Sequence, residues 1–172
     1  MNLQINRLTN ANIYLNGVDL LGRAEEVDLP QPKGVMIEHK GLGMFSKAEF
    51  PAGLDKMEMK IKWSSLYPEV MGAAFNLFAV QSLMVRADVM SFNAQGLAAE
   101  LPAVALVNGI FSEMPGLSIR KQENADVPSS VAVYYYQLSF AGIPQVEIDV
   151  MANVYKVNGI DQLAAFRMNQ GG

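Results

Sequence analysis

Residues 57–63 (MEMKIKW) decide the fold, because apolar and charged side chains alternate there at every position. A period of two places Met57, Met59, Ile61 and Trp63 on one side of an extended strand and the charged residues on the other. Residues 146–150 (VEIDV) repeat the pattern with an acidic outer face, and residues 26–29 (EVDL) repeat it more briefly. The sequence therefore predicts antiparallel sheet with one buried and one wet face.

Further strands are expected on either side of this stretch. Asn16-Gly17 between two apolar runs predicts a tight hairpin turn. Residues 86–92 and 102–111 have strand composition. Residues 131–140 (VAVYYYQLSF) are apolar at both parities, with 134, 136, 138 and 140 on one side and 131, 133 and 135 on the other. Such a run indicates a central strand or one covered by another subunit.

One helix is expected near residues 65–78. Ser65 can cap it, Pro68 fits its first turn, and Val70, Ala74 and Phe78 fall on one apolar stripe. Two segments read as irregular, the glycine-rich 40–55 and the polar 120–128. The predicted architecture is one domain over residues 1–172, mainly β: an antiparallel β-barrel or sandwich with one flanking α-helix and a long loop.

Composition favours a protein that is covered by copies of itself. Only 17% of the 172 residues are charged, against about 25% in an average domain, while 51% are hydrophobic. The formal net charge of −4 does not attract nucleic acid. No cysteine is present, the first ten residues do not form a signal peptide, and no apolar run has the length of a membrane helix. These features predict a homo-oligomer folded in a reducing compartment.

The residues for catalysis are missing from the sequence. His39 is the only histidine, so a nucleophile triad and a zinc site both lack partners. Gly41-Leu42-Gly43 reads as a turn and not as a nucleotide loop. The three tyrosines 134–136 lack the basic neighbours of a nucleic-acid binder and read as core or subunit contact. We expect no enzyme activity, no metal and no cofactor.

Several of these segments, in order, resemble the major tail tube proteins of contractile-tailed phages, a family that includes the tubes of R-type pyocins. Residues 8–17 (LTNANIYLNG) are similar to its opening strand and turn, and 27–33 (VDLPQPK) to the exit from its second strand. Residues 41–44 (GLGM) are similar to its glycine-methionine loop. The closing segments 135–138, 146–149 and 157–163 follow in the family's order. The resemblance covers residues 8–78 and 131–172.

The resemblance implies a structural subunit of the virion tail, assembled in the bacterial host cytoplasm. It implies hexameric rings whose sheets join into one inner barrel and which stack into a tube for DNA ejection. The partners would be further copies, the tail sheath protein, and the baseplate and tail terminator proteins. DNA would only pass through the lumen, and the subunit itself would not bind membranes. A pyocin-like or type VI secretion tube without a genome is the alternative, and a ligand-binding β-barrel or enzyme is a third interpretation.

Two sets of residues are candidates for these contacts. Exposed apolar groups on the glycine-rich segment 40–55 predict a contact between rings; they are Leu42, Met44, Phe45 and Phe50. Acidic strand faces, which repel phosphates, predict the channel wall; they are Glu147, Asp149, Glu26 and Asp28. Lysines on a neighbouring strand, such as Lys60 and Lys62, are able to pair with these acids and leave the wall near neutral.

Overall fold

The computed structural model describes residues 3–116 and 127–171 of the chain. Its strands and helices follow in the order β1 (Ile5–Leu15), β2 (Val18–Asp19), β3 (Ala24–Asp28), β4 (Gly34–His39), β5 (Ala48–Leu54), β6 (Met57–Trp63), α1 (Pro68–Ala74), β7 (Gln81–Asn93), β8 (Gly96–Glu113), β9 (Val127–Phe140), β10 (Ile143–Asp149), β11 (Val154–Val157), β12 (Ile160–Asp161) and α2 (Ala164–Asn169). The mainly β, antiparallel fold expected from the sequence is confirmed. Residues 120–126 of the predicted loop 120–128 lie outside the described residues. Its last two residues, Val127 and Pro128, begin β9.

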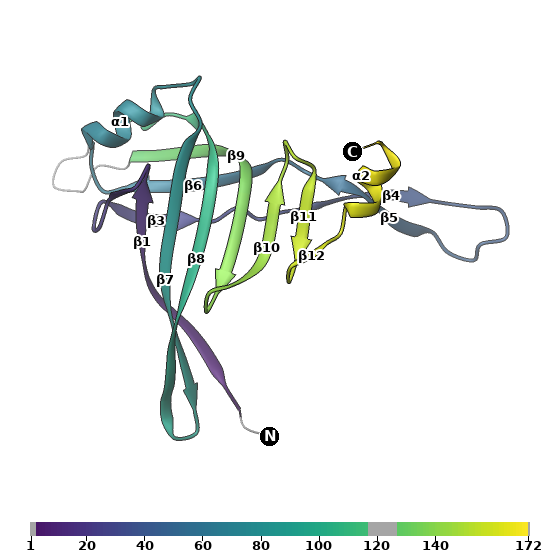
Figure 1. Cartoon of the computed structure of the whole chain (residues 1–172), viewed down its shortest axis with the longest axis horizontal. Helices are drawn as coiled ribbons and strands as arrows, with labels where there is room; N and C mark the ends of the chain where they lie inside the picture. Colours follow the sequence, from purple (N-terminus) through teal and green to yellow (C-terminus); the bar gives the residue numbers. More distant parts are fainter. Residues whose placement is uncertain (1–2, 117–126, 172) are drawn as a thin grey trace.

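Two layers of strands enclose the core. The longer layer runs β12-β11-β10-β9-β8-β7-β1-β2, and the shorter one consists of β3 and β6, with β6 paired to the first half of β9. Figure 1 shows that β3 and β6 cross the direction of β7 and β8. The strand β9 belongs to both layers, because it pairs with β6 over 127–133 and with β10 over 135–140. This is the corner of an orthogonal sandwich.

A bulge in β9 makes that corner. Asn108 and Gly109 of β8 are consecutive, yet they face Tyr135 and Val133 of β9, so Tyr134 is an extra residue. An extra residue bends the strand and shifts which positions face the core. The core face therefore continues from Val133 to Tyr136, and the predicted division of 131–140 into two fixed faces is wrong.

The core joins both layers through large side chains. Trp63, Met59 and Ile61 of β6 are fully buried, as the alternation in 57–63 predicts. Leu83, Val107 and Ile148 supply the opposite wall from the longer layer. The indole Nε1–H of Trp63 donates to the Ser129 hydroxyl at 2.9 Å, so its one polar atom is satisfied. The Asn16-Gly17 turn is confirmed, with φ of 49° and 82° at the two residues.

The predicted helix exists but is shorter than its apolar stripe. Pro68 begins α1, the N-cap is Tyr67 and not Ser65, and the helix ends at Ala74. Val70 and Ala74 are buried, whereas Phe75 and Phe78, beyond its end, are exposed. The predicted apolar positions therefore do not all face the core, because Gly72 and Asn76 favour an early end to the helix. Neither helix of the described chain is long and apolar enough to cross a membrane.

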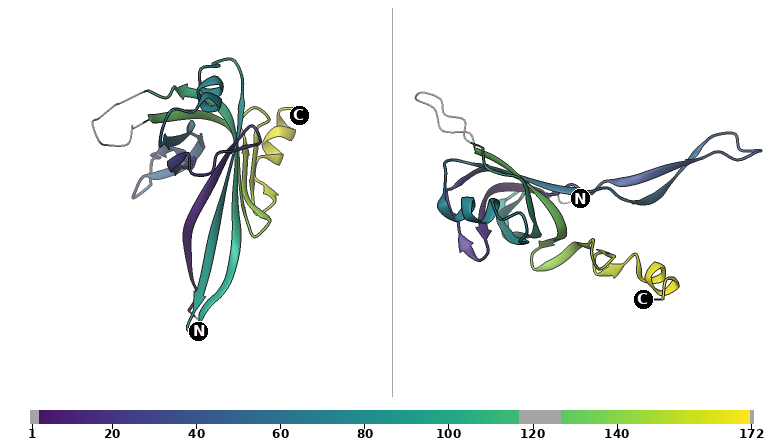
Figure 2. Two further views of the ribbon diagram at one scale, coloured as in Figure 1. Left: turned by 90° about the vertical axis from the view of Figure 1, so that its left-hand side faces the viewer. Right: turned by 90° about the horizontal axis from the view of Figure 1, so that it is seen from above.

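The segment expected to be irregular between residues 40 and 55 is largely a β-hairpin. Residues 48–54 form β5, which pairs with β4 from Gly34↔Leu54 to His39↔Ala48. Residues 40–47 at the tip, and Asp55 after β5, lack strand pairing. The sequence did not predict this strand because it contains Pro51 and Gly53, and both residue types disfavour sheet. Figure 2 shows that the hairpin extends well beyond the sandwich.

Candidate assembly surfaces

The β4–β5 hairpin presents an almost fully exposed arm. All six residues of β4 are exposed, and β5 is exposed except at Ala48, where it is partly covered. The two strands form a sheet of their own, paired with no other strand of the described chain. A two-stranded hairpin is marginal in water without further packing. An arm of this kind would gain stability from contact with another molecule.

The two faces of this arm differ in chemistry. Ile37 and Phe50 lie opposite one another, and His39 packs edge-on against Phe50 with ring centroids 6.1 Å apart. The other face carries Glu38 opposite Glu49, and Lys47 forms an ion pair with Glu38. Near residues 37–39 and 48–50 one face is thus mainly apolar and the other charged, which suits a contact on the apolar side and solvent on the other.

The structure separates the four apolar candidates on this arm. Leu42 and Phe45 at the tip are as exposed as in an extended peptide. Met44 folds back over the turn, where its sulfur accepts the Gly41 N–H at 3.4 Å. Phe50 lies on the shaft of the hairpin and is 55% exposed. Leu42 and Phe45 are thus almost free of contacts within the subunit. Met44, in contrast, helps to form the turn on which they lie.

Glu147 is held in a charge-paired row on the wet face of the longer layer. Its carboxylate pairs with Lys156 of β11 at 3.0 Å, and Lys156 lies opposite Asp161 of β12. The Tyr135 hydroxyl donates to Gln137 at 3.2 Å and lies 3.5 Å from Glu147. Burial, and next the charge of Glu147, raises the pKa of Tyr135. This face is polar and close to neutral around Glu147.

Asp149 has a local structural role in addition to its charge. Its Oδ1 accepts the backbone N–H groups of Met151 and Ala152, both at 3.0 Å. These bonds close the turn between β10 and β11, as aspartate side chains commonly do. Replacing Asp149 would consequently alter the turn as well as the charge.

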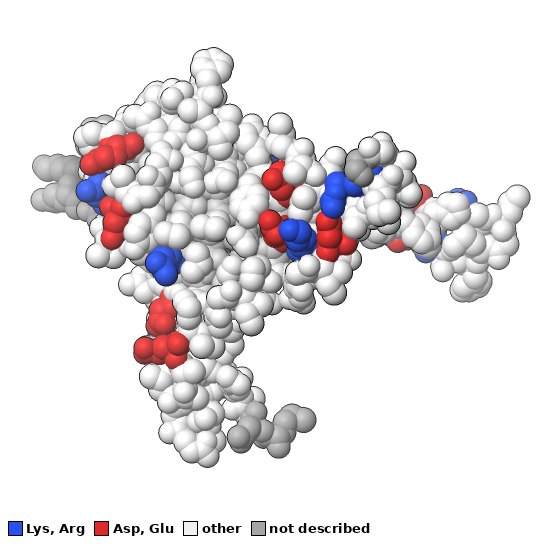
Figure 3. Space-filling model, viewed as in Figure 1, with Lys and Arg blue, Asp and Glu red and all other residues white. Residues whose placement is uncertain are grey.

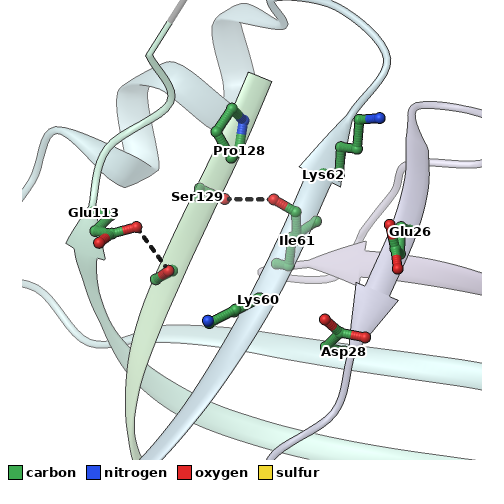
Figure 4. Close-up of a pocket in the computed structure, with 9 residues that line it drawn as sticks. Glu26, Asp28, Lys60, Ile61, Lys62, Glu113, Pro128 and Ser129 are labelled. Atoms are coloured by element: carbon green, nitrogen blue, oxygen red, sulfur yellow. Dashed lines mark hydrogen bonds between the residues drawn. The ribbon is translucent and has the colours of Figure 1, made fainter. Parts of the chain in front are cut away.

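Glu26 and Asp28 lie on the other layer, in a shallow pocket of about 400 Å³ (Figure 4). Glu26 faces Lys62 and Asp28 faces Lys60 across the β3–β6 pair. The lysines therefore lie beside the acids, as the sequence allowed. Glu26 and Asp28 alternate with Val27, and Glu147 alternates with the buried Ile148, so each pair points away from the shared core. The two acidic pairs occupy opposite outer faces of the sandwich.

The C-terminal helix α2 was not expected from the sequence, and a further ion pair anchors it. Arg167 pairs with Asp161 and also donates to the Asn153 carbonyl at 2.7 Å. The hydrogen bond from Arg167, with that from the Leu163 N–H, lowers the pKa of Asp161. The strand-like sequence of residues 154–157 is the one feature that could have predicted a position for Lys156 beside Glu147. No comparable pattern predicts the ion pair of Arg167 with Asp161, because that pair depends on how α2 packs.

Charges are sparse and of mixed sign on the face seen in Figure 3. Acidic and basic side chains lie next to one another over β10–β12, and wide areas between them are uncharged. Within residues 3–116 and 127–171, no group of three or more metal-binding side chains comes together.

Two comparisons with known proteins identify relatives of this chain. A family model described as "Phage tail tube protein FII" matches residues 5–171. The "Tail tube protein" of Escherichia phage P2 is 27% identical over 167 residues, covering 96% of each chain.

Proposed function

Because the chain belongs to the phage tail tube protein FII family, we propose that it forms hexameric rings that stack into the tube of a contractile tail and pass DNA through a central channel. Its place as a structural component of the virion tail follows from the family. We further propose that its role is structural and not catalytic. Its partners would be further copies of itself, the surrounding sheath protein, and the baseplate and terminator proteins at the two ends.

The exposed hairpin is the observation that carries the proposal. An arm that exposes Ile37, Leu42, Phe45 and Phe50 gains little from folding alone. Burying one such side chain contributes about 1.5–3 kcal/mol, so contact with a neighbouring subunit stabilises arm and assembly together. The longer layer supports lateral joining, since its two ends are the two-residue strands β2 and β12, which other copies are able to extend.

Polymerisation of the purified protein tests this proposal. We expect the scattering mass to rise with concentration above that of the monomer, and hollow tubes of constant width to appear by negative-stain electron microscopy. A protein that stays monomeric at millimolar concentration and shows no tubes would contradict it.

The carboxylates of the longer layer are the better candidates for the channel wall. That layer is a broad sheet whose ends are open to neighbours, so joining six of them would give a closed wall lined by the face of Glu147 and Asp149. Glu26 and Asp28 would then point towards the sheath, because they lie on the opposite layer. The Glu147–Lys156 pair would keep the wall near neutral and limit its affinity for DNA phosphates.

A pair of charge reversals tests which layer faces DNA. Glu147→Lys places two lysines side by side on the longer layer, whereas Glu58→Lys makes the same charge change on the outer face of β6. With tubes intact in both variants, we expect genome delivery to fall about tenfold only for Glu147→Lys, because each added phosphate contact slows passage. A loss confined to Glu58→Lys would assign the channel to the β3–β6 face instead.

The known source of the relative favours a genome-carrying tail over a pyocin-like or type VI secretion tube, since that protein comes from a phage. The neighbouring genes distinguish the two, because a pyocin-like cluster lacks capsid genes.

A further inference from the structure

Three asparagine-glycine pairs occur in the sequence, at residues 16–17, 108–109 and 158–159. An asparagine that precedes a glycine is able to lose its side-chain amide without an enzyme. In that reaction the backbone nitrogen of the glycine attacks Cγ of the asparagine, and glycine has no Cβ to hinder the approach. The structure places the three pairs in different surroundings, so it indicates which of them reacts.

Two of the pairs form turns of the same geometry. Leu15↔Val18 closes the first turn and Val157↔Ile160 closes the second, so each turn has two residues. The φ angles are 49° and 82° in the first turn and 50° and 79° in the second. Both turns are exposed, and a two-residue strand follows each of them. Turn shape and exposure therefore do not distinguish the two sites, and a difference in rate has to come from their contacts.

The contacts of the two turn asparagines differ. Asn16 Nδ2 donates to Oε1 of the buried Gln81 at 2.7 Å, and Asn16 Oδ1 accepts the Ser82 N–H at 3.0 Å. In the part of the chain that the structure describes, neither the Asn158 side chain nor the Gly159 N–H has a hydrogen-bond partner. Rotation of the Asn158 amide towards the Gly159 nitrogen therefore breaks no side-chain hydrogen bond. The same rotation at Asn16 breaks two.

The third pair is protected by the sheet. Asn108 and Gly109 lie within β8, which pairs with β7 on one side and with β9 on the other. Gly109 is buried. Attack at Asn108 requires this stretch of β8 to leave its neighbours, and opening of a central strand approaches the cost of global unfolding.

We propose that Asn158 is a site of spontaneous deamidation. The Gly159 nitrogen forms a bond to Cγ of Asn158, and the side-chain NH2 leaves with the proton of the Gly159 N–H as ammonia. The product is a five-membered cyclic imide. Water then opens the ring at either carbonyl and gives aspartate or isoaspartate. Water is the only further reactant, and both products add a negative charge.

The modified turn would lie at the end of the longer layer, because β12 follows it directly (Figure 1). Isoaspartate adds one carbon to the main chain, which would disturb the Val157↔Ile160 pairing and with it this short strand. The deamidation goes beyond the proposed function and does not depend on it. Under that function, deamidation of the free subunit would compete with the joining of copies through β12.

Peptide mapping by mass spectrometry measures deamidation at all three pairs in one sample of the dilute, monomeric protein, kept at mildly basic pH. We expect Asn158 to react roughly tenfold faster than Asn16 or more, because the Asn16 side chain has two hydrogen bonds to break first. The product at Asn158 should contain both aspartate and isoaspartate, since the ring opens at both carbonyls. Asn108 should stay unchanged.

Two variants serve as controls. Gly159→Asn keeps a residue type that tolerates positive φ but hinders the attacking nitrogen, so it should lower the rate at Asn158 to that of Asn16 or below. Gln81→Met removes one partner of the Asn16 amide and should raise the rate at Asn16 alone. Equal rates at Asn16 and Asn158 in the unmodified protein, or aspartate as the sole product, would overturn the inference. Tube formation by fresh protein does not depend on either result, so the proposed function stands or fails separately.

Discussion

Replacing Leu42 and Phe45 together by serine is expected to abolish tube formation while leaving the melting temperature of the subunit unchanged. Both side chains are fully exposed in the single subunit, so the folded chain loses no contact. In the proposed assembly they would be buried, and losing two large apolar groups would cost about 3 kcal/mol or more of contact free energy. That corresponds to roughly a hundredfold weaker association per contact or more.

The measurement is the protein concentration at which tubes appear, followed by light scattering and electron microscopy. The matched control is Leu42→Met with Phe45→Leu, which keeps the tip apolar and should polymerise near the concentration of the unmodified protein. Normal polymerisation of the serine variant would show that the tip is not an assembly contact. Met44 is left intact in both variants, since its sulfur helps to form the turn.

Gly109→Ala is expected to cause the largest loss of subunit stability, about 3 kcal/mol or more. An added Cβ would lie 2.2 Å from the carbonyl oxygen of Ala132 and 2.8 Å from Cγ1 of Val131. Both belong to β9, and the nearer atom is backbone, so relief requires the separation of β8 from β9. Overpacking of a core usually costs about 1–3 kcal/mol, and a backbone clash beside the corner bulge belongs at the upper end or beyond it.

Urea unfolding followed by circular dichroism measures this loss, with Gly72→Ala as the matched control. Gly72 lies within α1, and an added Cβ there has no atom within 4 Å. The same substitution should therefore raise stability by about 0.5–1 kcal/mol, because alanine favours helix. Equal unfolding midpoints for Gly109→Ala and the unmodified protein would contradict the packing described at the corner.

Local patterns predicted the strands but not the geometry that joins them. The alternation in 57–63 and the Asn16-Gly17 turn depend on neighbouring residues alone, and both are confirmed. The extra residue at Tyr134 depends on how β9 meets β8, β6 and β10 at once. Because odd-numbered and even-numbered positions of residues 131–140 are both apolar, the sequence does not show that the core-facing side changes from Val133 to Tyr136. The β4–β5 hairpin was missed because Pro51 and Gly53 disguise β5.

The candidate surfaces were predictable to a similar extent. The apolar tip residues follow from composition, and their exposure in the subunit agrees with that expectation. Whether Glu147 is bare or paired depends on cross-strand register, which places Lys156 opposite it. Glu26 and Glu147 lie on opposite outer faces of the sandwich, and this follows only from the fold into two layers.

The rotational symmetry of the assembled ring tests the central proposal most directly. End-on averages from cryo-electron microscopy of tubes grown from the purified protein should show six-fold symmetry around an open channel. The longer β layer of each copy should line that channel, and the β4–β5 hairpin should reach a neighbouring copy. A filled filament, or rings whose subunits touch through neither the hairpin nor the ends of the longer layer, would contradict the account.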